Sequence, residues 1–368
     1  MMKTTLTILA LALATSVSAQ ESPLWMRYCA ISPDGSAVAF TYKGDIYTVP
    51  TTGGTARQLT TNAAYDTHPV WSPDSKQLAF CSNREGSMDV YVMQREGGTP
   101  RRLTTNSNSE TPIAFKDNNT VLYTSSIMPS AKSIIFANRM LPQVYEVGTN
   151  GSRPHLFSAL PMMDISIRPN GDLLYHDQKG YEDPWRKHHR SPITRDIWLR
   201  RSGKYTKLTN FNGEDRTPVW AAQGDTFYYL SEEDGTFNVY MRNIDGTGKQ
   251  QLTRHTTNPV RFLTAANNGT LCYGYDGEIY TLKQGEQPQK LKVNIVTDKI
   301  DTDLDRQTLF TGATEIALSP DGKELAFVLH GDVYVTSNNY RTTKQITDTP
   351  EQEREIQFAP DGRSIVYA

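Results

Sequence analysis

One compact cluster of side chains in the sequence could do chemistry. The segment "WRKHHR" groups two guanidinium groups, one ammonium group and two imidazoles, at Arg186, Lys187, His188, His189 and Arg190. Such a cluster could clamp a carboxylate or a peptide C-terminus, or dock on an acidic partner surface. The alternative is a solvated loop whose charges pair with Glu182 and Asp183 just before it. Adjacent side chains diverge and no third ligand is evident, so we predict no metal site here.

A second set of residues consists of carboxylates at a repeated position. Asp66 and Asp215, in "DTHPVW" and "DRTPVW", each lie six residues before a recurring turn, and Glu353 is in register with them. Carboxylates repeated in this way could form a ring at the rim of a channel and select positively charged ligands. More often, such residues cap a crossover between units by accepting hydrogen bonds from backbone N–H groups.

Motifs for catalysis and for cofactors are missing from the sequence. It contains no G-x-S-x-G, no H-E-x-x-H, and no Walker or dinucleotide-binding glycine loop. We therefore assign no catalytic residue, no cofactor and no metal. Cys29, Cys81 and Cys272 lie far apart and form no C-x-x-C pair, which favours buried free thiols over a disulfide framework or a zinc site.

The elements that must position these residues form an internal repeat. A turn of the type "SPDG" recurs, followed each time by an apolar run such as "AVAFTY", an aromatic strand such as "DIYTV" and a short strand with "QLT". The turns begin at Ser32, Ser72, Lys116, Arg168, Ala221, Ala266, Ser319 and Ala359. Units of ~40–45 residues with four short strands are typical of a β-propeller. Its third strands carry aromatic residues that we expect to form a packing ladder: Tyr47, Tyr91, Tyr145, Trp198, Tyr240, Tyr280 and Tyr334.

The spacing of the repeats predicts the domains. Only the step from the sixth unit to the seventh is lengthened, by an acidic segment, so we predict a six-bladed all-β propeller over 20–293, a linker over 294–314 and the start of a second propeller over 315–368. The chain stops halfway through a blade, so we expect it to be part of a longer protein. Units three and four carry insertions, Ser126–Leu141 and Asp177–Thr194, on one rim. A partner or ligand is expected there, although neutral drift of surface loops is an equal alternative.

The N-terminus and the overall charge indicate where the protein acts. Residues 1–19 have Lys3, an apolar run and small residues before a cut after Ala19, which is typical of a cleavable signal peptide and too short for a membrane span. We therefore expect export, to the periplasm or outside the cell. The formal net charge is −2, whereas a nucleic-acid-binding protein usually has an excess of basic residues.

Several longer segments make the chain resemble the N-terminal half of tricorn-type serine peptidases. These segments are "GGTARQLT", "THPVWSPDSKQLAF", "ITRDIWL" and "KLTNFNGEDRTPVW". The repeat itself is also similar to TolB-type propellers and to the propellers of prolyl-oligopeptidase-like enzymes. The resemblance implies a second, larger propeller, a PDZ-like module and a serine-peptidase core further along the chain.

The resemblance also implies partners and a function. This portion would gate and channel peptides to the C-terminal PDZ and peptidase core, and a homo-oligomer is a further possibility. No catalytic residue can be carried over, because the family's catalytic region matches nothing within these 368 residues. The alternatives are a TolB-like interaction scaffold in the periplasm and the propeller of a prolyl-oligopeptidase-like peptidase.

Overall fold

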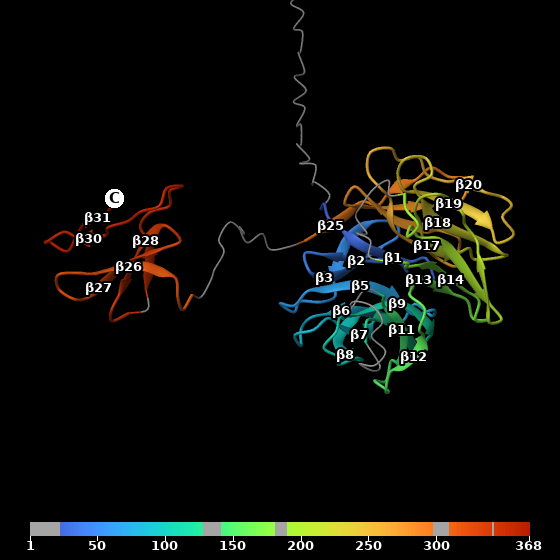
Figure 1. Cartoon of the computed structure of the whole chain (residues 1–368), viewed down its shortest axis with the longest axis horizontal. Helices are drawn as coiled ribbons and strands as arrows, with labels where there is room; N and C mark the ends of the chain where they lie inside the picture. Colours follow the sequence, from blue (N-terminus) through green and yellow to red (C-terminus); the bar gives the residue numbers. More distant parts are fainter. Residues whose placement is uncertain (1–22, 128–140, 181–189, 297–308, 341) are drawn as a thin grey trace, which may run out of the picture. The chain divides into compact units, whose positions relative to one another are not determined.

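The computed structural model describes residues 23–127, 141–180, 190–296, 309–340 and 342–368 (Figure 1). Every regular element in these ranges is a β-strand, and none of them contains a helix long and apolar enough to cross a membrane. The chain forms two compact units, Met1–Thr297 and Asp298–Ala368.

The first unit contains six sheets of four consecutive antiparallel strands. The first two sheets are β1 (Arg27–Ile31), β2 (Ala37–Tyr42), β3 (Asp45–Pro50), β4 (Gly54–Gln58), and β5 (Asp66–Trp71), β6 (Gln77–Ser82), β7 (Asp89–Gln94), β8 (Gly97–Arg102). The next two are β9 (Glu110–Asp117), β10 (Thr120–Ser125), β11 (Gln143–Gly148), β12 (His155–Ser158), and β13 (Met162–Ile167), β14 (Leu173–Asp177), β15 (Ile197–Arg201), β16 (Lys204–Lys207). The last two are β17 (Asp215–Trp220), β18 (Thr226–Ser231), β19 (Asn238–Asn243), β20 (Gln250–Gln251), and β21 (Arg261–Ala265), β22 (Leu271–Tyr275), β23 (Glu278–Leu282), β24 (Gln289–Lys290).

The "SPDG" turn joins the first two strands of a sheet through its own side chains. Ser32 Oγ donates to Asp34 Oδ1 at 2.5 Å, and the N–H of Gly35 donates to the carbonyl of Ser32 at 2.8 Å. Gly35 has a φ of +73°, a conformation that favours glycine. The turn also reaches the next sheet, because the N–H of Asp34 donates to Ser75 Oγ at 3.0 Å. The repeated tetrapeptide therefore closes a hairpin and links neighbouring sheets.

The recurring "LT" pair fixes the fourth strand against the third. In the first sheet, Thr60 Oγ1 accepts a hydrogen bond from the N–H of Ile46 at 2.9 Å and donates to Asp45 Oδ1 at 3.0 Å. The same bond from the third strand recurs in other sheets, at Thr104, Thr209, Thr253 and Thr347. This threonine is buried in every case, so its hydroxyl satisfies a main-chain donor inside the sheet.

The aromatic ladder predicted for the third strands is confirmed. Each aromatic residue pairs across the sheet with one on the second strand, as in Phe40 with Tyr47 and Phe80 with Tyr91, whose ring centroids lie 5.7 and 5.8 Å apart. These rings lie in apolar clusters that extend from one sheet to the next. The core of the first unit is thus a series of layers between neighbouring sheets.

The six sheets form a closed ring, because the first strand of each sheet contacts that of the next and β21 contacts β1. The chain then adds a further strand, β25 (Val293–Ile295), which pairs in parallel with β4 of the first sheet. In Figure 1 the orange end of this unit accordingly lies beside the blue first sheet. At this junction the N–H of Gly54 donates to the carbonyl of Lys292 at 2.8 Å. Strand pairing therefore joins the two ends of the ring.

The second unit repeats the sheet once and begins it again. β26 (Ala313–Leu318), β27 (Glu324–Leu329), β28 (Asp332–Ser337) and β29 (Thr343–Gln345) form an antiparallel sheet, and β30 (Gln357–Phe358) pairs with β31 (Ile365–Val366). The element bounds differ at two places from the predicted linker, 294–314. β25 includes Asn294 and Ile295, and β26 starts at Ala313.

The close approach at the ring junction gives a test of the closure. A Cβ atom on Gly53 (φ +83°) would lie 2.7 Å from the carbonyl oxygen of Lys292, whereas one on Gly97 (φ +85°), in the second sheet, would make an ordinary contact at 3.5 Å. Both Gly→Ala variants should lose about 1–2 kcal/mol of unfolding free energy through backbone strain. G53A should lose about 1–3 kcal/mol more, because β25 must move. Urea unfolding of the two variants measures the difference, and equal losses would contradict a closure that depends on β25.

Candidate ligand channel

A cavity of about 840 Å³ is lined by the innermost strands of all six sheets. β1, β5, β9, β13, β17 and β21 each contribute three or more consecutive residues to its wall. Because the ring is closed, these strands are held at fixed positions around it. We call this cavity the channel.

Every innermost strand carries a β-bulge at the same register. The pairing of β5 with β6, for example, shifts between Thr67 and Val70, and corresponding shifts occur in the other five. Five of the six bulges hold a residue other than glycine with φ between +47° and +58°: Tyr28, His68, Asp164, Thr217 and Phe262. Pro112 takes this position in β9, where its ring fixes φ at a negative value. A bulge re-aims side chains, and here all six residues line the channel.

One side of the channel is aromatic. The ring centroids of Tyr28 and His68 lie 3.7 Å apart, and those of Tyr28 and Phe262 lie 4.7 Å apart, so three neighbouring sheets bring their bulge residues together. Burial lowers the pKa of His68 to about 4 and raises that of the Tyr28 hydroxyl. Both side chains are therefore neutral near pH 7, and this wall offers uncharged aromatic surface.

The opposite side of the channel is polar. Thr217 Oγ1 donates to Asp164 Oδ2 at 2.7 Å, and the N–H of Thr217 lies 3.4 Å from His176 Nδ1. Asp164 is half-buried and faces the channel, where partial desolvation by the surrounding protein raises the pKa of its carboxyl. Burial also holds the pKa of His176 well below its usual value, so this imidazole is neutral and accepts a hydrogen bond.

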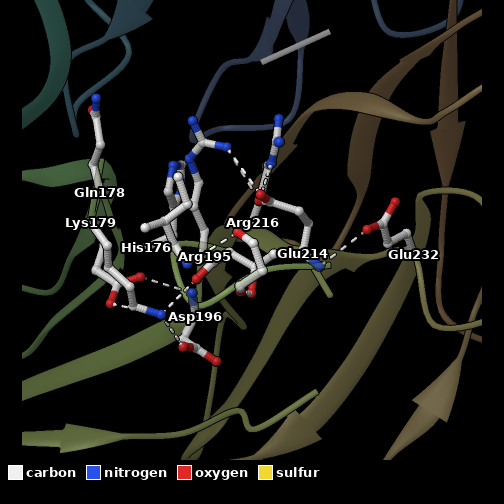
Figure 2. Close-up of polar contacts among 12 residues, drawn as sticks. His176, Gln178, Lys179, Arg195, Asp196, Glu214, Arg216 and Glu232 are labelled. Atoms are coloured by element: carbon white, nitrogen blue, oxygen red, sulfur yellow. Dashed lines mark hydrogen bonds and ion pairs between the residues drawn. The ribbon is translucent and has the colours of Figure 1, made fainter. Parts of the chain in front are cut away.

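Two arginines of this polar side share one carboxylate, as Figure 2 shows. Arg216 Nε donates to Glu214 Oε2 at 2.8 Å, and Arg195 Nη1 lies 3.3 and 3.4 Å from the two oxygens of Glu214. Glu214 is buried, and both arginines line the channel. A buried carboxylate that contacts two guanidinium groups fixes their position, since removing one partner would leave a buried charge uncompensated.

The basic cluster of the fourth unit falls largely outside the described residues. Arg186, Lys187, His188 and His189 are not described, and Arg190 is exposed. Its predicted role in binding a carboxylate or a partner stays a prediction. Among the residues that are described, no group of three or more His, Cys, Asp or Glu side chains could hold a metal ion, and all three cysteines are buried with free thiols.

The repeated carboxylates lie in the interior. Asp66 starts β5 and accepts hydrogen bonds from Arg84 Nη2 at 2.8 and 3.0 Å, while Asp215 starts β17 and is equally buried. Neither residue lines the channel. In the second unit, Glu353 is buried and accepts a hydrogen bond from Thr349 Oγ1 at 2.6 Å. Ligand selection by these residues stays a prediction, although their burial favours the structural alternative.

Sequence reasoning missed a fourth carboxylate of this set, Glu110 at the start of β9. It lies six residues before the third turn, the same spacing that identified the others, so the signal was present. Burial, together with the neighbouring Asp89 carboxylate, raises the pKa of Glu110 to about 7, and burial raises that of Asp215 to about 6. Sequence reasoning also missed Tyr28, Asp164, Thr217 and Phe262, because nothing in their types indicates a positive φ.

A closed ring of four-stranded antiparallel sheets around a channel defines a β-propeller. Residues 23–288 match the family described as the tricorn protease N-terminal β-propeller domain, and the chain belongs to this family.

The relatives of the chain are longer proteins. Tricorn protease homolog 1 of Streptomyces coelicolor is 28% identical over 364 residues, which are 95% of this chain and 32% of the relative. The tricorn protease of Thermoplasma acidophilum is 21% identical over 330 residues, which are 85% of this chain and 29% of that protein. The crystal structure of the tricorn protease matches 92% of this chain and 33% of its own with a TM-score of 0.66 and 18% identity. The chain thus spans a third or less of these proteins.

The raised pKa of Glu110 predicts a specific dependence of stability on pH. The folded protein holds this proton up to about pH 7, whereas the unfolded chain releases it near the ordinary glutamate pKa of 4.5. The stability that the protonated group contributes is thus present below pH 4.5 and is lost as pH rises through 7. E110Q keeps an uncharged side chain, so its unfolding free energy should fall less between pH 5 and pH 8 than that of the wild type, by on the order of 2 kcal/mol.

Guanidinium unfolding at several pH values measures this effect. The exposed E96Q serves as the matched control and should keep the pH dependence of the wild type. An E110Q profile parallel to the wild type would show that Glu110 is ionised in the folded protein.

Proposed function

We propose that this chain is the substrate-handling propeller of a serine peptidase and binds peptides in its channel. Two observations support the proposal. The chain belongs to the N-terminal propeller family of tricorn proteases, and the inner strands of its six sheets line one cavity. The cavity volume, about 840 Å³, lies in the range of about 300–1,000 Å³ typical of ligand sites and would hold a short peptide segment.

The channel would act by selection and guidance and not by bond cleavage. The sequence carries no motif for a nucleophile with its base, and the relatives named as proteases are about three times as long as this chain. Peptide hydrolysis would therefore be carried out by a PDZ and peptidase core outside these residues. Because the ring is closed by strand pairing, the channel would admit extended segments and exclude folded domains.

We further propose that residues 1–19 direct the protein to the periplasm or the outside of the cell. The peptides it meets would then be extracytoplasmic, which suits scavenging of peptides. Processing at Ala19 can be read directly by N-terminal sequencing of the protein purified from its host.

Peptide binding in the channel is tested by filling it. Thr111 and Met163 occupy the position just before the bulge in β9 and β13, and both line the channel. T111W and M163W should each lower the affinity of the purified chain for a fluorescent peptide library at least tenfold. T206W, on the exposed outer strand β16, should bind as the wild type does.

Fluorescence anisotropy measures the binding, and the thermal midpoint of each variant shows whether it is folded. Full affinity in folded T111W and M163W would place peptide binding elsewhere, and no binding by the wild type would overturn the proposed function. Binding of a folded partner protein with no peptide binding would favour an interaction scaffold.

A further inference from the structure

We infer that the channel prefers peptides in which an acidic residue neighbours an aromatic or large aliphatic one. This inference rests on the proposed binding of peptides in the channel and specifies their chemistry. It follows from two features of the channel wall, a set of arginines and the aromatic cluster of Tyr28, His68 and Phe262.

The first feature is the charge of the wall. Among the described residues, those lining the channel include four cations, Lys116, Arg195, Arg216 and Arg261, and one carboxylate, Asp164. Glu214 behind the wall adds a second carboxylate, so cations still exceed anions. A positive wall around a narrow cavity focuses its field and favours anionic groups over cationic ones.

Two of these four cations occupy the same position in the repeat. Arg216 and Arg261 each come immediately before the bulge residue, in β17 and β21 of neighbouring sheets. Arg195 is held beside Arg216 through Glu214. Guanidinium groups bind carboxylates through paired, directional hydrogen bonds, so they suit the carboxylates of aspartate and glutamate.

The second feature is the uncharged aromatic surface. Phe262 contacts Tyr28, which in turn lies against His68 at a centroid distance of 3.7 Å. All three line the channel. Together they present ring faces and edges to an apolar side chain, and aromatic contacts of this kind contribute about 0.5–1.5 kcal/mol beyond area burial.

The two features are adjacent in the structure. Arg261 and Phe262 are successive residues of β21, so a guanidinium group and an aromatic ring lie within one residue of each other along the wall. An extended peptide advances ~3.3 Å per residue. Neighbouring residues of one peptide can therefore place a carboxylate by the arginines and an apolar side chain by the rings.

Four matched octapeptides test the preference on the purified 368-residue chain. Each is a labelled alanine-based peptide with Glu-Phe, Gln-Phe, Lys-Phe or Glu-Gly at its centre. Glu-Phe should bind at least tenfold more tightly than Lys-Phe and at least threefold more tightly than Gln-Phe or Glu-Gly. The advantage of Glu-Phe over Gln-Phe should shrink as salt rises from 50 to 500 mM, since added ions screen charge.

Two variants assign the preference to the wall. R261Q should abolish the advantage of Glu-Phe over Gln-Phe while keeping that over Glu-Gly, and F262A should do the reverse. R101Q and Y205A, on the exposed outer strands β8 and β16, are the matched controls and should keep both preferences.

The outcomes separate this inference from the proposed function. If all four peptides bind equally well, the channel still binds peptides but the preference is wrong. Preferences that persist in folded R261Q and F262A would likewise overturn the assignment to these residues. If no peptide binds, the proposed function fails, and this inference fails with it.

Discussion

The parallel pairing of β25 with β4 is the constraint on which the channel depends. The first and sixth sheets pack against each other through a shared apolar cluster, and the strand added after the sixth sheet joins these two ends of the ring by main-chain pairing. The junction leaves no room for a side chain at Gly53, so the chain meets itself backbone to backbone. Each inner strand is then fixed between two neighbours, which allows side chains from different sheets to keep defined positions in one cavity.

Within the closed ring, the repeat and its variation have separate roles. The turn, the aromatic ladder and the "LT" threonine recur because they build the sheet and its contacts. The bulge also recurs, but its residue changes from sheet to sheet, from Tyr28 to Asp164 to Thr217. The constant part of the repeat thus supplies the backbone geometry, and the variable part supplies a wall that is aromatic on one side and polar on the other.

The sequence allowed prediction of those features that local chemistry determines. Four-stranded units, their turns and the packing of Tyr47 or Tyr91 follow from periodicity and turn residues. The closure by β25 could not be predicted in this way, because this short strand carries no periodic signal and two of its three residues, Asn294 and Ile295, were placed in the linker. The wall of the channel was missed because alternation along a strand fails at a bulge, where one extra residue changes which side chains point inward. Asp66 and Asp215 were therefore considered for the channel rim although they are buried.

The same bulge explains why the channel wall is richer in cations than in carboxylates. Three inner strands of the ring begin with an acid, Asp66, Glu110 or Asp215, and none of these lines the cavity. The position one residue later, just before the bulge residue, lines the cavity in four of the six inner strands. In two of these four strands the residue at this position is an arginine. A carboxylate turned into the protein needs a partner or a proton, which Arg84 provides for Asp66 and a raised pKa provides for Glu110. The acids of the repeat thus lie in the interior of the protein, whereas Arg216, which follows Asp215, and Arg261, at the same position in β21, line the channel.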